Sequence, residues 1–219
     1  WAKPLGWFMD DSAKFLREIF RTGERAELFR LAYWAGSTFV AYLVIPAIFT
    51  KLVLGERLRD YGLGLSGLGK HAWIYVLLYL LVLPAVVTVA FSESFQKTYP
   101  FYDNAYKSLF DLLVWEMVYA VQFLSLEFFY RGFMIQSIRK RFGYWAIFVS
   151  VIPYCMIHFG KPYPETIGAI IAGLVLGTLA VFTRSVWLGV AIHVSVAVTM
   201  DVLSLSIQGK LSGIFERLF

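Results

Sequence analysis

Charged residues are scarce in this sequence. Asp, Glu, Lys and Arg make up 16% of the 219 residues, whereas an ordinary soluble domain contains about 25%. Hydrophobic residues make up 59%, and a chain of this size has too high a surface-to-volume ratio to hide them all inside. The composition therefore excludes a water-soluble globule and predicts that a lipid bilayer surrounds most of the chain.

Other residues and patterns are scarce or missing as well, and each absence narrows the chemistry. The single cysteine, Cys155, allows no internal disulfide and lies in an apolar run, where a small buried hydrophobe is expected. The HExxH pattern of helix-borne zinc peptidases is absent, and so is the Gly-x-Ser-x-Gly elbow of serine hydrolases. The net charge of +5 comes without a basic patch interleaved with aromatics, so it predicts contact with anionic lipid headgroups and not with nucleic acid.

Long apolar stretches dominate what is present. A membrane-spanning helix needs about 20 mostly apolar residues. Pro46 is expected to kink the first stretch and not to end it, and Gly143 is expected to cap the third. We therefore predict an all-α fold, a polytopic transmembrane helical bundle of about six spans plus interfacial helices. The six stretches, of which the fourth is short, cover residues 28–54, 71–91, 109–138, 144–159, 165–183 and 186–207.

The N-terminal segment, residues 1–26, differs from these stretches. Phe15, Leu16, Ile19 and Phe20 recur at helical spacing among charged residues, which predicts an amphipathic helix lying on the membrane interface. No internal repeat or soluble second domain is visible. The rest of the chain divides into two transmembrane helices with their loops, a core that carries the intramembrane polar residues, and a short tail: residues 27–106, 107–208 and 209–219.

Ionisable residues inside the spans carry the functional information, because each is costly in hydrocarbon and needs a partner or a water-filled cavity. Glu127 and Arg131 are four residues apart and share one helix face, which fits an internal ion pair as well as a reactive site. Glu116 lies about three turns earlier on the same face. It is expected to line the same cavity or, as we favour, to lie near the interface.

Two histidines, His158 and His193, lie within apolar segments. Glutamate plus histidine is sufficient to hold and deprotonate a water molecule and to supply a proton to a leaving amine. The same residues can instead bind zinc, whose usual ligands are histidine and carboxylate. In a third reading, Glu127 and Arg131 form the proton relay of a small transporter. Inverted repeats in the sequence would favour this reading, and none is visible.

Three segments, in this order, resemble the motifs of the CPBP intramembrane proteases. This family contains the type II CAAX prenyl proteases and bacteriocin-processing or immunity proteins, and its motifs are Glu-Glu-x-x-x-Arg, Phe-x-x-x-His and His-x-x-x-Asn. The resemblance covers about half of the chain, residues 109–207. The matching segments are Ser125-Leu-Glu127-Phe-Phe-Tyr-Arg131-Gly, Tyr154-Cys-Met-Ile-His158, and His193 in the last span.

The resemblance implies an intramembrane endopeptidase of the glutamic type, in which residues 107–208 form the protease core. Glu127 would activate the hydrolytic water and Arg131 would hold that glutamate. His158 would share the water or polarise the scissile carbonyl, and His193 would stabilise the oxyanion. No cofactor is expected, zinc being the less favoured alternative. Sorting-type bacterial members, the myxosortases, are among the proteins that the chain resembles.

Two departures from the motifs matter. Leu126 stands where the family has its first glutamate, and Ala197 stands where it has asparagine. Loss of one oxyanion donor can reduce the rate by about 10²–10³, and Tyr154, Lys161 or a backbone amide are the candidates to replace it. Glu165, at the start of the fifth span, is the reserve base; its simpler role is that of an acidic first-turn residue that suits the helix dipole.

The predicted function is therefore hydrolysis of a peptide bond in a membrane-associated substrate: a leader, a sorting tail or a lipidated C-terminus. The alternative, which the two departures favour, is a catalytically inactive CPBP-like scaffold or regulator that binds another membrane protein. The expected partners are a membrane-anchored peptide or protein substrate and the bilayer, without nucleic acid. The expected location is a multi-pass position in the bacterial cytoplasmic membrane, as the bacterial relatives imply.

Overall fold

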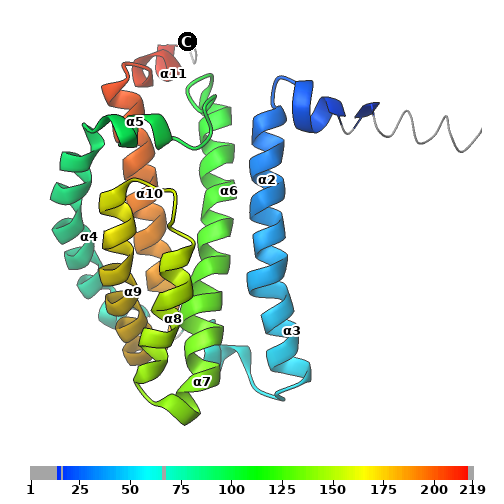
Figure 1. Ribbon diagram of the computed structural model, residues 1–219, viewed down its shortest axis with the longest axis vertical. Helices are drawn as coiled ribbons and strands as arrows, with labels where there is room; N and C mark the ends of the chain where they lie inside the picture. The colour runs from blue at the N-terminus through cyan, green and yellow to red at the C-terminus, as the bar shows by residue number, and fades with distance from the viewer. Residues whose placement is uncertain (1–13, 16, 66–67, 217–219) are drawn as a thin grey trace, which may run out of the picture.

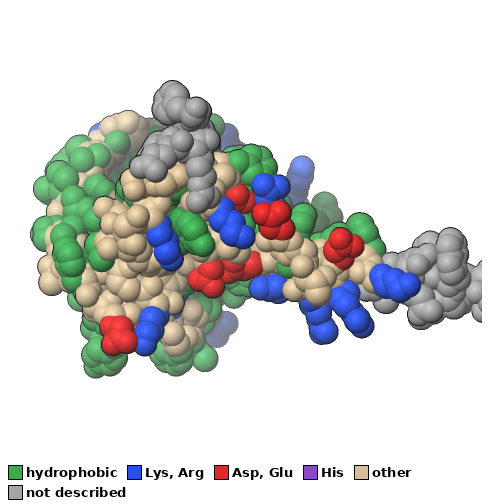
Figure 2. Space-filling model, turned by 90° about the horizontal axis from the view of Figure 1, so that it is seen from above, with side chains coloured by type: hydrophobic (Ala, Val, Ile, Leu, Met, Phe, Trp, Pro, Cys, Tyr) green, Lys and Arg blue, Asp and Glu red, His purple; other side chains and the backbone are tan. Residues whose placement is uncertain are grey.

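The computed structural model describes residues 14–15, 17–65 and 68–216, and over these residues it contains helices and loops but no strand (Figure 1). The predicted all-α class is confirmed. Five helices are long and apolar enough to cross a membrane. Figure 2 looks onto one end of the bundle, where charged side chains gather while hydrophobic side chains lie around the perimeter. This distribution is typical of a helical membrane protein.

The first span is continuous from Ala26 to Leu52. It consists of α2 (Ala26–Phe39), the π-helical turn η2 (Val40–Val44) and α3 (Ile45–Leu52). The wider turn η2 directly precedes Pro46, which has no N–H to donate, and the helix continues through this position. The prediction that Pro46 does not end the span is confirmed.

The third span runs from Leu109 to Phe142 without a break. It contains α6 (Leu109–Glu127), the π-helical segment η4 (Phe128–Met134) and α7 (Ile135–Phe142). Gly143 ends it with a positive φ of 56°, and its N–H donates to the Arg139 carbonyl at 2.8 Å. The predicted cap is therefore confirmed.

The fourth predicted span, residues 144–159, is wrong as a full crossing. The helix found there, α8 (Trp145–Met156), has 12 residues, which at 1.5 Å per residue is about 18 Å against a hydrocarbon core of about 30 Å. The chain leaves α8 beside α6, short of the end of the bundle (Figure 1). This early end places His158 in a loop within the bundle instead of in a helix.

The other helices complete the bundle. The bounds of α4, α9 and α10 lie close to apolar stretches of the sequence, and the short α5 and α11 lie at one end of the bundle (Figure 1). They are η1 (Glu18–Thr22), η3 (Leu58–Tyr61), α4 (Leu68–Ala90), α5 (Glu93–Thr98), α9 (Tyr163–Thr183), α10 (Trp187–Ile207) and α11 (Leu211–Glu216).

The predicted interfacial helix of residues 1–26 falls largely outside the described residues, which exclude 1–13 and Leu16. The described part contains η1, whose Phe20 ring packs edge-on against Tyr33 of α2 at 6.0 Å between ring centroids.

Helix α6 is the centre of the packing, with α2 on one side and α10 on the other (Figure 1). A ladder of stacked rings runs along it, because Trp115, Tyr119 and Phe123 recur at four-residue spacing, with centroids 4.8 and 4.4 Å apart. On α9, a Cβ at Gly177 would lie 2.9 Å from the Ile147 side chain, so this glycine lets α8 approach closely.

Candidate active site

Glu127, the last residue of α6, is the buried acid around which the site is built. Its side chain is 1% exposed, and its Oε1 lies 3.5 Å from Arg131 Nη1 and 2.9 Å from His193 Nδ1. An isolated carboxylate in such surroundings would be strongly destabilising, so these two partners are what allow it to remain charged. The ion pair expected from the four-residue spacing is present, and α10 adds the histidine.

Gly189 of α10 makes room for this carboxylate. A Cβ at this position would lie 2.3 Å from Glu127 Oε2, closer than any real contact. His193 follows four residues later on the same helix face. One turn of α10 therefore supplies both the space for the carboxylate and its histidine partner.

Tyr154 of α8 connects the remaining members of the site. The Arg131 guanidinium, 2% exposed, lies 3.8 Å from the centre of the Tyr154 ring. The Tyr154 hydroxyl lies 3.2 Å from His193 Nε2. A cation over a desolvated aromatic face is worth about 2 kcal/mol or more, so the tyrosine holds the arginine while its hydroxyl reaches the histidine.

His193 has a polar contact at each of its two ring nitrogens. Nδ1 faces the Glu127 carboxylate at 2.9 Å, an ion-pair contact that favours a proton on Nδ1 because a carboxylate oxygen only accepts. In the neutral ring, Nε2 then accepts from the Tyr154 hydroxyl. The His193 ring also stacks on the Phe123 ring, with planes 3° apart and centroids at 5.3 Å. Three residues from two helices, Glu127 and Phe123 of α6 and Tyr154 of α8, thus hold the ring in one orientation.

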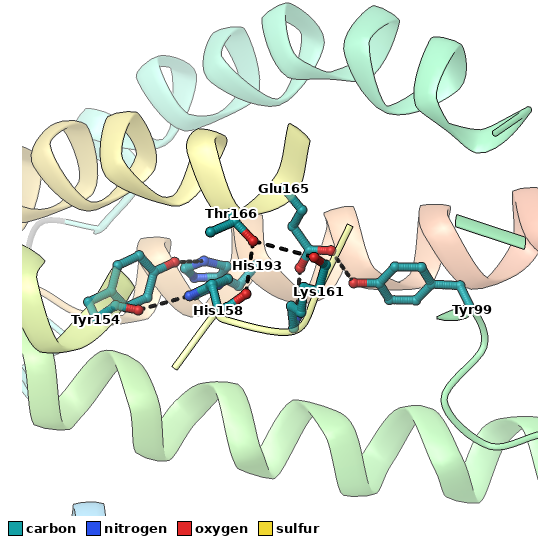
Figure 3. A network of polar contacts seen from close by, with 7 residues as sticks. All are labelled: Tyr99, Tyr154, His158, Lys161, Glu165, Thr166 and His193. Atoms are coloured by element: carbon teal, nitrogen blue, oxygen red, sulfur yellow. Dashed lines mark hydrogen bonds and ion pairs between the residues drawn. The ribbon is translucent and has the colours of Figure 1, made fainter. Parts of the chain in front are cut away.

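His158 is held on the same tyrosine from the loop after α8 (Figure 3). Its Nδ1 donates to the Tyr154 carbonyl at 2.8 Å, and its ring lies edge-on to the Tyr154 ring at 4.7 Å. The Thr166 hydroxyl donates to the His158 carbonyl at 2.9 Å and fixes the loop against α9. The ring therefore has Nε2 left as an acceptor, and it lines a cavity of about 160 Å³.

Glu165 lies at the start of α9, near the same loop (Figure 3). One oxygen accepts from Lys161 Nζ at 2.6 Å, and the other accepts from the Tyr99 hydroxyl at 2.5 Å. The lysine also lies 5.1 Å from the centre of the Phe101 ring. Both carboxylate oxygens of Glu165, the reserve base, therefore already accept hydrogen bonds. The ammonium of Lys161, a candidate oxyanion donor, is bound to Glu165.

Leu126 and Ala197, the two residues that depart from the family motifs, lie in different surroundings. Leu126 is buried against Tyr130, Tyr154 and Ala169, and it also lines the cavity beside His158. Adjacent helix residues point about 100° apart, so Leu126 faces the cavity while Glu127 faces α10. Ala197 is buried in the apolar core between α6 and α10.

Glu116 does not join the Glu127 cluster. Its carboxyl lies close enough to that of Asp201 on α10 for the two to interact electrostatically. Asp201 is eight residues beyond His193 and thus about 12 Å further along the helix. The Trp115 indole donates to Asp201 Oδ2 at 2.7 Å. Asp201, Trp115 and Gly189 were not predicted from the sequence as residues of the site. The spacing of Asp201 by two turns from His193 was the available signal.

A zinc site, the less favoured alternative, would need several His, Cys, Asp or Glu side chains grouped around one point. Within residues 14–216, apart from the undescribed positions 16, 66 and 67, no three or more His, Cys, Asp or Glu side chains group together in a way that could hold one. Glu127 contacts Arg131 and His193, whereas His158 is bound to the Tyr154 carbonyl.

Fold and site together define a polytopic helical membrane protein with a buried Glu–His–Tyr cluster between α6, α8 and α10. Residues 108–199 match the family described as Type II CAAX prenyl endopeptidase Rce1-like, and this confirms the resemblance to the CPBP family over that part of the chain. Neither the curated proteins nor the solved structures compared with the chain gave a match. The family match indicates a protease, and with it a peptide substrate and a lipid environment.

Proposed function

We propose that this protein is a glutamic-type intramembrane endopeptidase. It hydrolyses a peptide bond of a membrane-associated substrate, a leader, a sorting tail or a lipidated C-terminus, in the cytoplasmic membrane of a bacterium. The observation that best supports the proposal is the chain of contacts from Glu127 through His193 to Tyr154, at 2.9 and 3.2 Å, with His158 held on the same tyrosine.

In this proposal Glu127 activates the water through His193. The buried carboxylate orients the imidazole and stabilises the imidazolium that forms when Nε2 accepts the proton, as in other carboxylate–histidine pairs. His158 Nε2 holds the water from the cavity side. The water oxygen bonds to the scissile carbonyl carbon, its proton passes to His193, and His193 returns that proton to the amine as the C–N bond breaks.

Tyr154 replaces the oxyanion donor that Ala197 cannot supply. Before the reaction its hydroxyl donates to His193 Nε2. Once His193 has taken a proton, Nε2 becomes the donor, and the tyrosine proton is released to bond the developing oxyanion. Arg131 over the Tyr154 ring stabilises negative charge nearby. Such donors act most strongly in a site from which water is excluded.

The test uses the purified protein in proteoliposomes with two substrate sets, a library of membrane-anchored peptides and a farnesylated CAAX peptide. Cleavage is read as new termini by mass spectrometry. Glu127→Gln, His158→Ala and His193→Ala are expected to lower cleavage at least 100-fold. Glu93→Gln is the matched control, because this glutamate is exposed and pairs with Lys97 one turn away.

The outcomes of this test distinguish the metal-free peptidase from a zinc peptidase, from a peptidase with another base and from an inactive scaffold. Cleavage by the wild type that survives exhaustive EDTA treatment supports the metal-free mechanism, and loss that zinc restores contradicts it. Cleavage that persists in Glu127→Gln moves the base elsewhere. A wild type that binds peptides from the library but cuts none of them contradicts the endopeptidase proposal and favours the scaffold.

A further inference from the structure

A small cavity borders the site on the side of α2. It has a volume of about 160 Å³, and its walls include Trp34 and Tyr42 from the first span, Tyr119, Gln122 and Phe123 from α6, and His158. Phe123 stacks on His193 and His158 is bound to Tyr154, so two walls of the cavity belong to the proposed catalytic cluster. A group bound here would lie directly beside that cluster.

The volume limits what the cavity can hold. An apolar cavity of about 150 Å³ accommodates one benzene molecule. The cavity therefore fits one aromatic ring or one branched aliphatic side chain. A prenyl chain of about 15 carbons has two and a half times the carbon atoms of benzene and does not fit. The cavity suits a single amino-acid side chain, and a lipid group would have to remain in the bilayer.

One wall residue lacks a partner. Gln122 is 7% exposed, and within the part of the chain that the structure describes its Oε1 accepts no hydrogen bond. A buried acceptor without a donor costs about 1–3 kcal/mol. The neighbouring polar groups are engaged: the Thr38 hydroxyl donates to the Trp34 carbonyl, and Lys161 binds Glu165. Gln122 Oε1 is thus a wall acceptor that the proposed reaction, which uses His158 Nε2 to hold the water, does not already use.

The first span forms the wall opposite His158, and its two aromatic residues differ in how firmly they are held. Tyr42 stacks on Phe129 at 4.5 Å between ring centroids and lies edge-on to Tyr130 at 5.9 Å, so it is a fixed wall. Trp34 is 39% exposed, and its nearest ring, Tyr119, is 6.5 Å away. Trp34 therefore sets the outer limit of the cavity and is the residue whose size decides what enters.

We infer that this cavity is a substrate subsite that takes one apolar side chain between leucine and phenylalanine in size, next to the scissile bond, while Gln122 Oε1 accepts a backbone N–H of the substrate. The inference rests on the proposed peptidase function for its reaction. Gln122 is a positioning residue and Trp34 a specificity residue. Trp34 and Tyr42 lie outside the segment 108–199 that matches the family, so the first span adds selectivity to the shared core.

The test measures retention of peptides on immobilised Glu127→Gln protein in nanodiscs. The probe is a set of membrane-anchored peptides in which each central position in turn is Gly, Ala, Leu, Phe or Trp, quantified by mass spectrometry. At one position, Leu and Phe are expected to be retained about 10-fold better than Gly. Trp34→Ala is expected to shift the preference to Trp, whereas Trp73→Ala, a lipid-facing control on α4, leaves it unchanged.

A second experiment changes the peptide and tests the hydrogen bond to Gln122 separately. N-methylation of the peptide amide that Gln122 binds removes the donor and is expected to weaken retention about 3- to 10-fold in protein with Gln122. In Gln122→Leu the methyl group should no longer matter, and Gln122→Glu, which keeps the acceptor, should restore the effect. A merely structural role for Gln122 would leave the sensitivity to methylation in place.

Retention without any side-chain preference, or sensitivity to methylation that persists in Gln122→Leu, overturns the subsite. The wild-type protein is measured in parallel, counting cut and intact peptide together, so the result does not depend on one variant folding. The same samples distinguish the two proposals. Cleavage without selectivity refutes the subsite alone, and selective retention without cleavage refutes the peptidase alone.

Discussion

A single added carbon at Gly189 tests the proposed site directly. In Gly189→Ala the new Cβ would lie 2.3 Å from Glu127 Oε2, whereas ordinary contact begins at 3.4 Å. Since α10 is packed against α6, the movable group is the carboxylate, which has to shift by about 1 Å. That shift breaks the alignment with Arg131 and with His193 Nδ1, now at 3.5 and 2.9 Å.

Two opposing effects determine the size of the change in stability. Alanine is better than glycine in a helix interior by about 1 kcal/mol. Breaking a buried ion pair costs about 3–5 kcal/mol. The free energy of unfolding of Gly189→Ala is therefore expected to fall by about 2–4 kcal/mol. Peptide cleavage is expected to fall about 100-fold, because a displacement of about 1 Å at a reacting group has that effect.

The assay is thermal unfolding in detergent, together with peptide cleavage. Gly168→Ala on α9 is the matched control, because a Cβ there meets nothing within 4 Å, and its stability should rise by about 1 kcal/mol. Combining Gly189→Ala with Glu127→Ala removes the group that the Cβ displaces. In that background the alanine should stabilise the helix, so the effect of the same substitution changes sign.

The reasoning is refuted if Gly189→Ala is as stable and as active as the wild type, or if its effect is the same with and without the Glu127 carboxylate. The second result would mean that the cost comes from helix packing and not from the position of the acid.

The remaining predictions concern three other positions. Arg131→Lys keeps the charge but loses the planar contact at 3.8 Å over Tyr154, so stability should fall by about 1–2 kcal/mol in thermal unfolding; an unchanged midpoint would contradict the role of the ring. Glu165→Gln should keep cleavage within about 3-fold of the wild type, because its carboxylate is already bound at both oxygens; abolished cleavage would make it the base. A hydrogen bond from Lys140 lowers the pKa of Glu56 below its ordinary value of 4.5, so this contribution is present at neutral pH and is lost as the pH falls through the lowered pKa. Wild type should therefore be more stable than Glu56→Gln at pH 7, and the two should converge in acid; a constant difference would contradict the linkage.

The membrane spans could be predicted from the sequence because the bilayer imposes them. A helix in hydrocarbon satisfies its own backbone, so length and hydropathy suffice to locate it. The stretch 144–159 was misjudged for the same reason. Its residues are apolar enough for the bilayer, but hydropathy does not report that the helix ends at Met156 or that Gly160, with φ of 93°, turns the chain back.

The Glu127–Arg131 pair was predictable because it depends on spacing along one helix. The orientation of the pair was not. The sequence shows that Leu126 replaces a motif glutamate, but only the packing of α2, α8 and α10 around α6 decides that Leu126 faces the cavity while Glu127 faces His193. A rotation of about 100° between adjacent residues separates these two environments.

The sequence by itself therefore determined the class of the protein, the helices that carry the polar residues and the identity of the buried acid and histidines. Tertiary structure alone decided their assembly. The central position of Tyr154, the space that Gly189 leaves for the carboxylate and the Gln122 oxygen that accepts no hydrogen bond from the described residues all arise between helices far apart in the chain. Such contacts depend on how helices pack side by side, and the order of residues along one helix does not contain that information.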